Sequence, residues 1–336
     1  MVPAPTEFLM RHRFIALLVA LGLAATACGG SDSGSSVATD VESFHPADMG
    51  WDLVWSDEFD GAALDAAKWG FEQNCWGGGN EELQCYTDSA TNVEVRDGLL
   101  HIIALEESST GLAVSEDRPD AATAGTKTQP YTSGRIRTKD LADWTYGRFE
   151  VRARLPHGQG LWPAIWMLPT DSPYGGWAAG GEIDIMEAVN LKAGTDLDSR
   201  SVHGTLHYGA EWPNNRSSGA AFPFRDDNPA DSFHVYAVEW EEGEIRWYVD
   251  DAHYATQTAD GWFSEGADGA APFDSQFHLI LNVAVGGGWP GPPDDATVFP
   301  QVMEVDYVRV YECSSSPGDG TGCATVSDRA RLVGGG

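Results

Sequence analysis

Three carboxylates within seven residues constrain this chain more than any other feature. Glu182, Asp184 and Glu187 stand among isoleucine and methionine, and the first basic residue after them is Lys192. Alternating apolar and acidic residues are typical of a β-strand, whose successive side chains point to opposite faces. Glu182 and Asp184 are therefore expected on one face. Strict alternation would place Glu187 on the core face, where an unpaired charge is very costly.

A β-bulge at Ile185–Met186 resolves this conflict, because one extra residue moves every later side chain to the other face. All three acids then line one surface. Two Glu side chains flanking a shorter Asp can bring two carboxyl groups about 5–5.5 Å apart, as retaining glycoside hydrolysis requires. The alternative is an acidic, solvated strand face without chemistry. Like charges on one face destabilise a sheet, which disfavours that alternative.

The stretch from Trp177 to Glu187 resembles the active-site strand of glycoside hydrolase family 16, and more narrowly that of the bacterial laminarinases (endo-β-1,3-glucanases). The family pattern is Glu-x-Asp-x-x-Glu in this bulged form and Glu-x-Asp-x-Glu in the lichenase branch. The resemblance implies Glu182 as nucleophile, Asp184 as its partner and Glu187 as general acid/base. It covers residues 50–312, with several motifs in the family order.

Short alternating segments separated by turn signals, with little helical pattern, indicate an all-β sandwich. Asp97-Gly98 is a favoured hairpin turn between two such segments. The resemblance implies a jelly roll of two curved antiparallel sheets with a concave substrate cleft. We expect the catalytic domain at residues 50–312, a polar surface insertion at 106–129 and a disordered tail at 313–336.

Residues 1–28 are typical of an export signal. A basic Arg-His-Arg run precedes ten apolar residues, too few to span a bilayer, and small residues lead to Cys28. This ending resembles a bacterial lipoprotein signal, which implies a lipid on Cys28 and a location on the outer face of the cell membrane. Ordinary cleavage and free secretion is the alternative, and either Met1 or Met10 can be the start. Residues 29–49 are expected to form a flexible Gly/Ser-rich linker.

The charge balance restricts the partners of the chain. It has 51 acidic and 20 basic residues, a net charge of −31, which repels nucleic acid and other polyanions. We expect a neutral β-glucan as the partner, contact with a membrane only through the lipid anchor, and a monomer.

Four cysteines remain after Cys28. An even number in an exported chain predicts two disulfides, and their spacings fit no zinc site. Three pairings are possible. Short-range bridges would join Cys75 to Cys85 and Cys313 to Cys323.

The resemblance also implies substrate-binding residues along the chain. Asn80 lies on a Gly-rich polar loop, and Trp177 matches a sugar-stacking tryptophan of the family. His207, in preference to His203, matches a histidine close to the acid/base. The alternatives are a solvated turn, tryptophans of the core and a satisfied structural histidine. The full substrate-binding set is Asn80, Arg135, Trp162, Trp177, Trp212, Asn282 and Trp289.

A structural calcium ion is a further implication of the resemblance. Asp306 matches the aspartate of a calcium site on the convex face, to which Glu58 and Gly98 would contribute oxygen atoms. Calcium requires several oxygen ligands, and the sequence supplies few here. No cofactor is expected for catalysis.

The expected function is therefore a retaining endo-β-1,3-glucanase that cleaves laminarin-like glucans by double displacement. Alternatives within the family are hydrolysis of mixed-linkage glucan, agarose, carrageenan or xyloglucan. The bulged motif disfavours the lichenase type, and the negative charge disfavours carrageenan. An alternative of another class is a non-catalytic glucan-binding protein, but such proteins typically lose one catalytic Glu and all three acids are present here.

Overall fold

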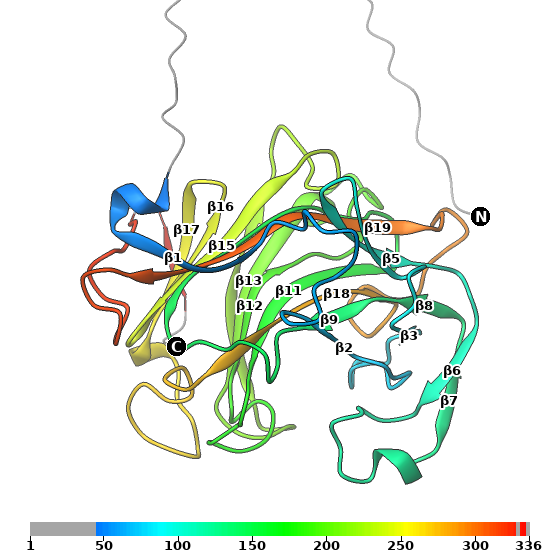
Figure 1. The fold of residues 1–336 in the computed structure, drawn as a ribbon, viewed down its shortest axis with the longest axis horizontal. Helices are drawn as coiled ribbons and strands as arrows, with labels where there is room; N and C mark the ends of the chain where they lie inside the picture. The colour runs from blue at the N-terminus through cyan, green and yellow to red at the C-terminus, as the bar shows by residue number, and fades with distance from the viewer. Residues whose placement is uncertain (1–44, 327–329, 334–336) are drawn as a thin grey trace, which may run out of the picture. The chain divides into compact units, whose positions relative to one another are not determined.

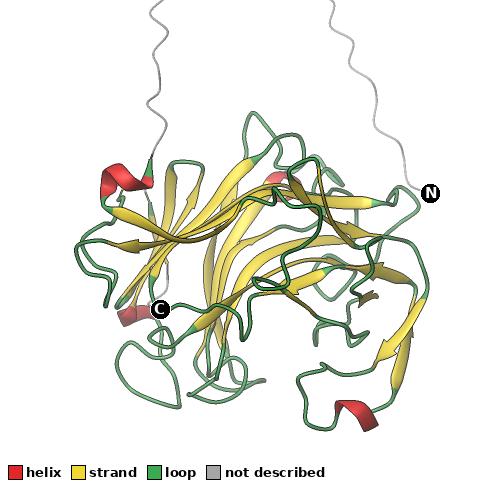
Figure 2. Cartoon of the chain, viewed as in Figure 1, coloured by secondary structure: helices red, strands yellow, loops and turns green. Residues whose placement is uncertain are grey.

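The computed structural model describes residues 45–326 and 330–333. The predicted export signal, Cys28 and nearly all of the predicted linker lie outside these residues. Within them, the regular structure consists of strands and short 3-10 helices (Figure 2), and no helix is long and apolar enough to cross a membrane. The 3-10 helices are η1 (Pro46–Met49), η2 (Ala121–Thr123), η3 (Asp198–Arg200) and η4 (Ala259–Gly261).

The strands follow the short alternating segments of the sequence. In chain order they are β1 (Trp51–Asp57), β2 (Gly70–Phe71), β3 (Gln84–Tyr86), β4 (Val93–Arg96), β5 (Leu99–Ala104), β6 (Ser109–Leu112), β7 (Thr126–Gln129), β8 (Tyr131–Ser133), β9 (Arg135–Arg137), β10 (Gly147–Arg154), β11 (Leu161–Pro169), β12 (Glu182–Glu187), β13 (Ser201–Tyr208), β14 (Arg216–Pro223), β15 (His234–Glu241), β16 (Glu244–Val249), β17 (Ala252–Thr258), β18 (Phe277–Val285), β19 (Gln301–Cys313) and β20 (Arg331–Val333).

Two large sheets form a jelly-roll sandwich, as predicted (Figure 1). One sheet has the order β20-β17-β16-β15-β10-β19-β5-β4, with β1 also paired to β19. The other has the order β14-β13-β12-β11-β18-β9-β2 and contains the acidic strand β12 near its middle. All pairings in this second sheet are antiparallel, so directly opposed residues share a face.

A tryptophan in the core between the sheets fixes the position of β12. Trp247 of β16 is fully buried, and its indole N–H donates to the backbone carbonyl of Asp184 at 2.9 Å. Gly204 of β13 makes room for that indole, since a Cβ there would lie 2.3 Å from Trp247 Cδ1. The opposite sheet therefore supports the acidic strand at the backbone of Asp184.

The structure confirms the predicted hairpin and both short-range disulfides, and it shows regular structure in the predicted polar insertion. The hairpin around Asp97-Gly98 is confirmed, because β4 and β5 pair across it. The stretch 106–129, predicted to be a polar surface insertion, contains a small two-stranded sheet of β6 and β7. Both short-range disulfides, Cys75–Cys85 and Cys313–Cys323, are present in the structure.

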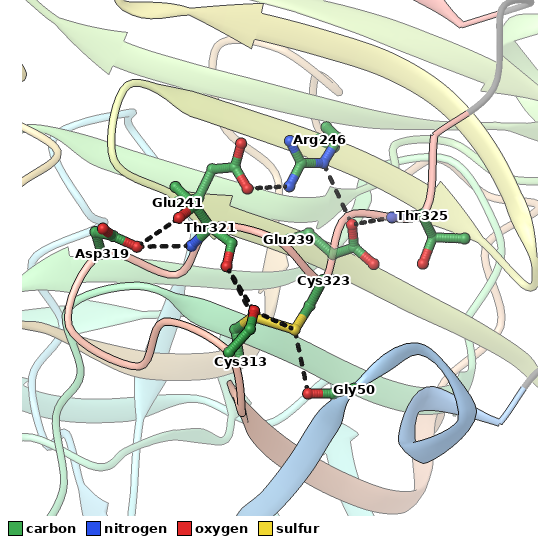
Figure 3. Close-up of a disulfide and its surroundings, with 10 residues drawn as sticks. Gly50, Glu239, Glu241, Arg246, Cys313, Asp319, Thr321, Cys323 and Thr325 are labelled. Atoms are coloured by element: carbon green, nitrogen blue, oxygen red, sulfur yellow. Dashed lines mark hydrogen bonds and ion pairs between the residues drawn. A yellow bond between two sulfur atoms is a disulfide. The ribbon is translucent and has the colours of Figure 1, made fainter.

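The prediction of a disordered tail at 313–336 is wrong for the part that the structure describes. Cys323 is tied to the end of β19 by its disulfide, and the Thr325 N–H donates to a carboxylate oxygen of Glu239 at 3.0 Å (Figure 3). Further on, β20 pairs in parallel with β17, and Val333 is buried. Gly/Ser-rich composition indicated disorder, whereas a few long-range contacts hold the segment in place.

Candidate active site

The acidic strand β12 contains the predicted bulge. On one side, β11 pairs Ile165 with Met186 but Trp166 with Asp184, so Ile185 is an extra residue. The pairing with β13 shifts within the same stretch, between Asp184 and Glu187. Burial agrees, because Ile183, Ile185 and Met186 are buried whereas Glu182 and Glu187 are partly exposed. The bulge therefore places all three acids on one face, hereafter the acid face.

Cross-strand register brings other predicted residues to the acid face. Glu187 lies opposite Ala164 of β11, Ala164 lies opposite Asn282 of β18, and Asn282 lies opposite Arg135 of β9. On the other side of β12, Glu187 lies opposite His203. Residues predicted from distant parts of the sequence thus converge in one row across the sheet.

Glu182 is held by two predicted site residues. Trp177 Nε1 donates to Glu182 Oε2 at 2.7 Å, and His207 Nε2 lies 3.7 Å from Glu182 Oε1. His207 also lies 3.3 Å from Asp184 Oδ2. The resemblance placed His207 close to Glu187. The structure differs, because the β12–β13 register sets His207 opposite Glu182 and sets His203 opposite Glu187.

Glu187 has aromatic surroundings. Trp162 Nε1 donates to Glu187 Oε1 at 3.0 Å, which places Trp162 on the acid face. The Trp162 ring meets that of Trp289 edge-on at 5.4 Å, and Trp289 meets His203 at 5.1 Å. One Glu of the pair is therefore held by Trp177 and His207, and the other by Trp162.

Burial and neighbouring charges shift the pKa values of Glu182, Glu187 and His207. Burial, helped by the charge of Asp184, raises the pKa of Glu182 to about 8. Burial and the charges of Asp184 and Glu182 raise the pKa of Glu187 well above its usual value. Burial lowers the pKa of His207, but its interaction with Asp184 and the charge of Glu182 outweigh burial and raise it to about 10. Both glutamates therefore keep a proton to higher pH than an ordinary Glu, and the His207 cation beside Glu182 and Asp184 opposes this rise at Glu182.

A buried polar layer adjoins the acids around Trp166. The Arg135 guanidinium lies 4.6 Å from the centre of the Trp166 ring and 5.6 Å from that of Tyr86. Trp166 Nε1 donates to Asn282 Oδ1 at 2.8 Å, and Asn282 Nδ2 donates to the Tyr86 hydroxyl at 3.1 Å. Glu72 Oε1 lies 3.0 Å from Arg135 Nε and balances its charge. Substrate contact by Arg135 and Asn282 stays a prediction, because both side chains are largely buried.

Sequence reasoning missed Trp166, Tyr86 and Glu72. Trp166 had a usable signal, since the alternation that puts Trp162 on the acid face puts Trp166 there too. Tyr86 lies in the short strand β3 and Glu72 directly after β2, and no periodic pattern connects either of them to the acids.

Loops carry the remaining predicted residues. The Asn80 carbonyl accepts from Gly288 N–H at 2.8 Å, which joins the disulfide-closed loop to the segment that precedes Trp289. The Trp212 N–H donates to the Trp177 carbonyl at 3.0 Å, so these two tryptophans come from adjacent loops. Trp177, Trp212 and Trp289 are 43%, 72% and 45% exposed, which leaves their rings free to receive a ligand.

Comparison with known proteins agrees with this geometry. A family model described as "Beta-porphyranase A-D, GH16 domain" matches residues 51–313. The chain belongs to glycoside hydrolase family 16. Within the family, its similar relatives include "Glucan endo-1,3-beta-glucosidase A1" of Niallia circulans, 45% identical, with 80% of this chain and 39% of that protein covered. The chain thus spans about two fifths of that relative.

Two further matches, a sequence and a structure, are covered over most of their length by this chain. "Beta-glucanase" of Rhodothermus marinus is 43% identical, with 78% of this chain and 85% of the relative covered. The solved laminarinase structure from Rhodothermus marinus is 43% identical, with a TM-score of 0.63 and coverage of 78% of this chain and 97% of that chain.

The donor set named for calcium does not fit the ion. Glu58 accepts hydrogen bonds from Arg309 Nε at 2.9 Å and from Arg309 Nη2 at 2.8 Å, which lowers the pKa of Glu58. Asp306 is paired with Arg152. Both carboxylates are already neutralised by guanidinium groups, so calcium binding at Glu58, Gly98 and Asp306 stays a prediction without structural support.

Proposed function

We propose that this chain is an endo-β-1,3-glucanase that hydrolyses laminarin-like glucans with retention of anomeric configuration. The observation that carries the proposal is the bulged strand β12, which puts Glu182 and Glu187 on one face in different electrostatic environments. The names of the similar family members support the linkage specificity.

In the first step, Glu182 attacks the anomeric carbon while Glu187 gives its proton to the glycosidic oxygen. The bond between the anomeric carbon and that oxygen breaks, and an ester to Glu182 forms. The His207 cation beside Glu182 Oε1 favours the carboxylate form of the nucleophile. The Trp177 indole N–H, bound to Oε2, orients the same carboxylate.

In the second step, Glu187 acts as a base. Esterification removes the negative charge of Glu182, and that charge is one cause of the raised pKa of Glu187. The pKa of Glu187 therefore falls in the intermediate, after it has given up its proton. Glu187 then takes a proton from water as the water oxygen attacks the anomeric carbon and releases Glu182.

The exposed tryptophans supply sugar-binding surfaces on both sides of the acids. Trp177 and Trp212 lie on the side of Glu182, and Trp289 lies on the side of Glu187 through its contact with Trp162. Aromatic rings bind the apolar faces of pyranose sugars without needing charge. A neutral glucan also suits a chain with a net charge of −31.

The test is release of reducing ends from laminarin, barley mixed-linkage glucan and agarose, with the wild-type chain and Glu187→Ala. A ladder of oligosaccharides from laminarin, lost in the variant, is the expected result. Activity on barley glucan or agarose but not on laminarin would agree with the proposed mechanism and contradict the proposed linkage specificity. Binding of laminarin without hydrolysis would favour a glucan-binding protein.

A second candidate is hydrolysis of a β-galactan. The matching family model is described as a β-porphyranase, which favours this reading, and agarose in the assay tests it. Against it stand the glucanase names of the relatives at 43–45% identity.

We also propose that the chain is exported and acts as a monomer, either anchored through a lipid on Cys28 or secreted. Support comes from the sequence of residues 1–28 and from the two disulfides, which persist in oxidising compartments.

A further inference from the structure

Three side-chain atoms of the candidate active site converge on one point. Glu182, Asp184 and His207 each offer one ligand atom, and these three atoms all lie within 4.8 Å of one another. His207 Nε2 is 3.3 Å from the Asp184 oxygen and 3.7 Å from the Glu182 oxygen. Among the residues that the structure describes, this is the one group of His, Cys, Asp and Glu gathered closely enough to hold a metal ion.

The spacing suits a tetrahedral metal centre. Zinc binds histidine nitrogen at about 2.0–2.1 Å and carboxylate oxygen at about 2.0–2.2 Å, so two ligand atoms around it lie roughly 3.3–3.5 Å apart. The two distances from His207 Nε2 lie close to this range, and only small side-chain movements would complete the site. One imidazole and two carboxylates suit zinc and related transition metals, with a fourth position left open.

The polar atoms of this cluster are incompletely satisfied. The Asp184 side chain is 2% exposed, and its Oδ2 atom, which points toward His207, makes no hydrogen bond of good geometry. His207 Nδ1 is also buried without a hydrogen-bond partner. A divalent cation bound here replaces the proton on His207 Nε2, which leaves to solvent, and its two positive charges balance the carboxylates of Glu182 and Asp184.

We propose that Glu182, Asp184 and His207 form an inhibitory binding site for a divalent transition-metal cation, with Zn²⁺ as the probe. The inhibitory effect rests on the proposed function, because a cation on Glu182 Oε1 occupies the nucleophile. Hydrolysis of laminarin is then lost in Zn²⁺ and restored by a chelator. Ca²⁺ and Mg²⁺ at the same concentration do not inhibit, because they require more oxygen ligands than the cluster offers.

The experiment measures metal binding separately from activity. Zn²⁺ is titrated into the full chain by calorimetry, and its position is found from anomalous scattering of zinc-soaked crystals. His207→Gln removes the nitrogen ligand. Loss of a hydrogen-bond partner of a metal ligand typically lowers metal affinity by roughly 10–100-fold. Loss of the ligand itself should lower the Zn²⁺ affinity of this site by at least as much.

Two further variants make the result specific. His203→Gln changes a histidine on the same strand and face, outside the cluster, and should leave Zn²⁺ affinity unchanged. Asp184→Asn keeps the side-chain shape while removing the buried charge, and should also weaken binding. Circular dichroism establishes that each variant is folded before its affinity is compared.

Zinc density between Glu182, Asp184 and His207, lost in His207→Gln, would support the proposal. Zinc elsewhere only, or equal affinity in wild type and His207→Gln, would overturn it. A chain that binds zinc in the cluster but leaves laminarin intact even in the absence of metal would support the site and refute the proposed function. A chain that hydrolyses laminarin but places no zinc there would refute the inhibitory site alone.

Discussion

Trp247 donates its indole N–H to the backbone carbonyl of Asp184 at 2.9 Å, from the sheet opposite the acids. The bond reaches β12 immediately before the extra residue Ile185. A bulge disrupts the local ladder of a sheet, so an outside donor that fixes the backbone there also fixes the neighbouring carboxylates. Trp247 thus connects the core to the geometry of the candidate catalytic residues.

Trp247→Phe should lower both stability and turnover. The buried carbonyl of Asp184 loses its indole donor, which costs about 1–3 kcal/mol in the free energy of unfolding, and the smaller ring leaves a gap beside Gly204. Urea unfolding measures the first effect, and kcat on laminarin measures the second. Trp240→Phe, a fully buried indole that bonds Phe273, is the matched control. Its stability should fall while kcat stays near wild type, and an equal loss of kcat in both variants would contradict a specific role for Trp247.

Trp162→Phe should move the alkaline limb of the kcat/KM profile to higher pH. The Trp162 hydrogen bond stabilises the charged form of Glu187 and so lowers its pKa against the larger raising effect of burial. Without the donor, the pKa of Glu187 rises further and the acid form persists to higher pH. An alkaline limb that moves to lower pH in this variant would contradict the assignment of Glu187 as the acid.

His207→Gln should reduce kcat by about 10²-fold, similar to the loss of one preorganised donor, and should move the acidic limb of kcat/KM to higher pH. The His207 cation lowers the pKa of Glu182, so its removal raises that pKa and delays formation of the nucleophile. An acidic limb at the wild-type position would show that His207 does not act on Glu182.

The same variant has a stability signature. The pKa of His207 is raised from 6.5 to about 10, so its contribution is fully present below pH 6.5 and is lost as pH rises through about 10. Wild type should therefore lose more stability than His207→Gln across this window in urea unfolding. Parallel curves for the two proteins would mean that the folded state does not hold His207 as a cation.

The double variant Cys313→Ser, Cys323→Ser should lose about 2–4 kcal/mol in the free energy of unfolding, the usual contribution of a disulfide. KM for laminarin should stay unchanged, because the bridge links the end of β19 to the segment that Thr325 bonds to β15 (Figure 3), and both strands belong to the sheet that does not contain β12. A large rise in KM would show that this segment reaches the substrate.

The sequence predicted those parts of the site that follow from local conflict or alternation. The bulge in β12 could be inferred because Glu187 would otherwise face the core, and the family resemblance assigns Trp162 to the substrate-binding set. The partner of His207 could not be predicted from the sequence, because the register between β12 and β13 determines which acid lies opposite each histidine.

Long-range contacts account for the remaining differences. The buried stack of Arg135 with Trp166 and Tyr86 joins residues from three separate strands, and no period in the sequence relates them. The segment after Cys313 reads as disordered by composition, yet single contacts such as Thr325 with Glu239 hold it. Composition indicates how much apolar surface a segment can bury, but it does not indicate individual hydrogen bonds to distant residues.

The proposed mechanism is tested most directly by trapping the covalent intermediate with a 2-deoxy-2-fluoro laminaribiosyl fluoride and locating the ester by peptide mass spectrometry. The expected result is an ester on Glu182 in the wild-type chain and no label on Glu182→Gln. An ester on Asp184 or Glu187, or hydrolysis of laminarin with no trapped intermediate and an inverted product, would contradict it.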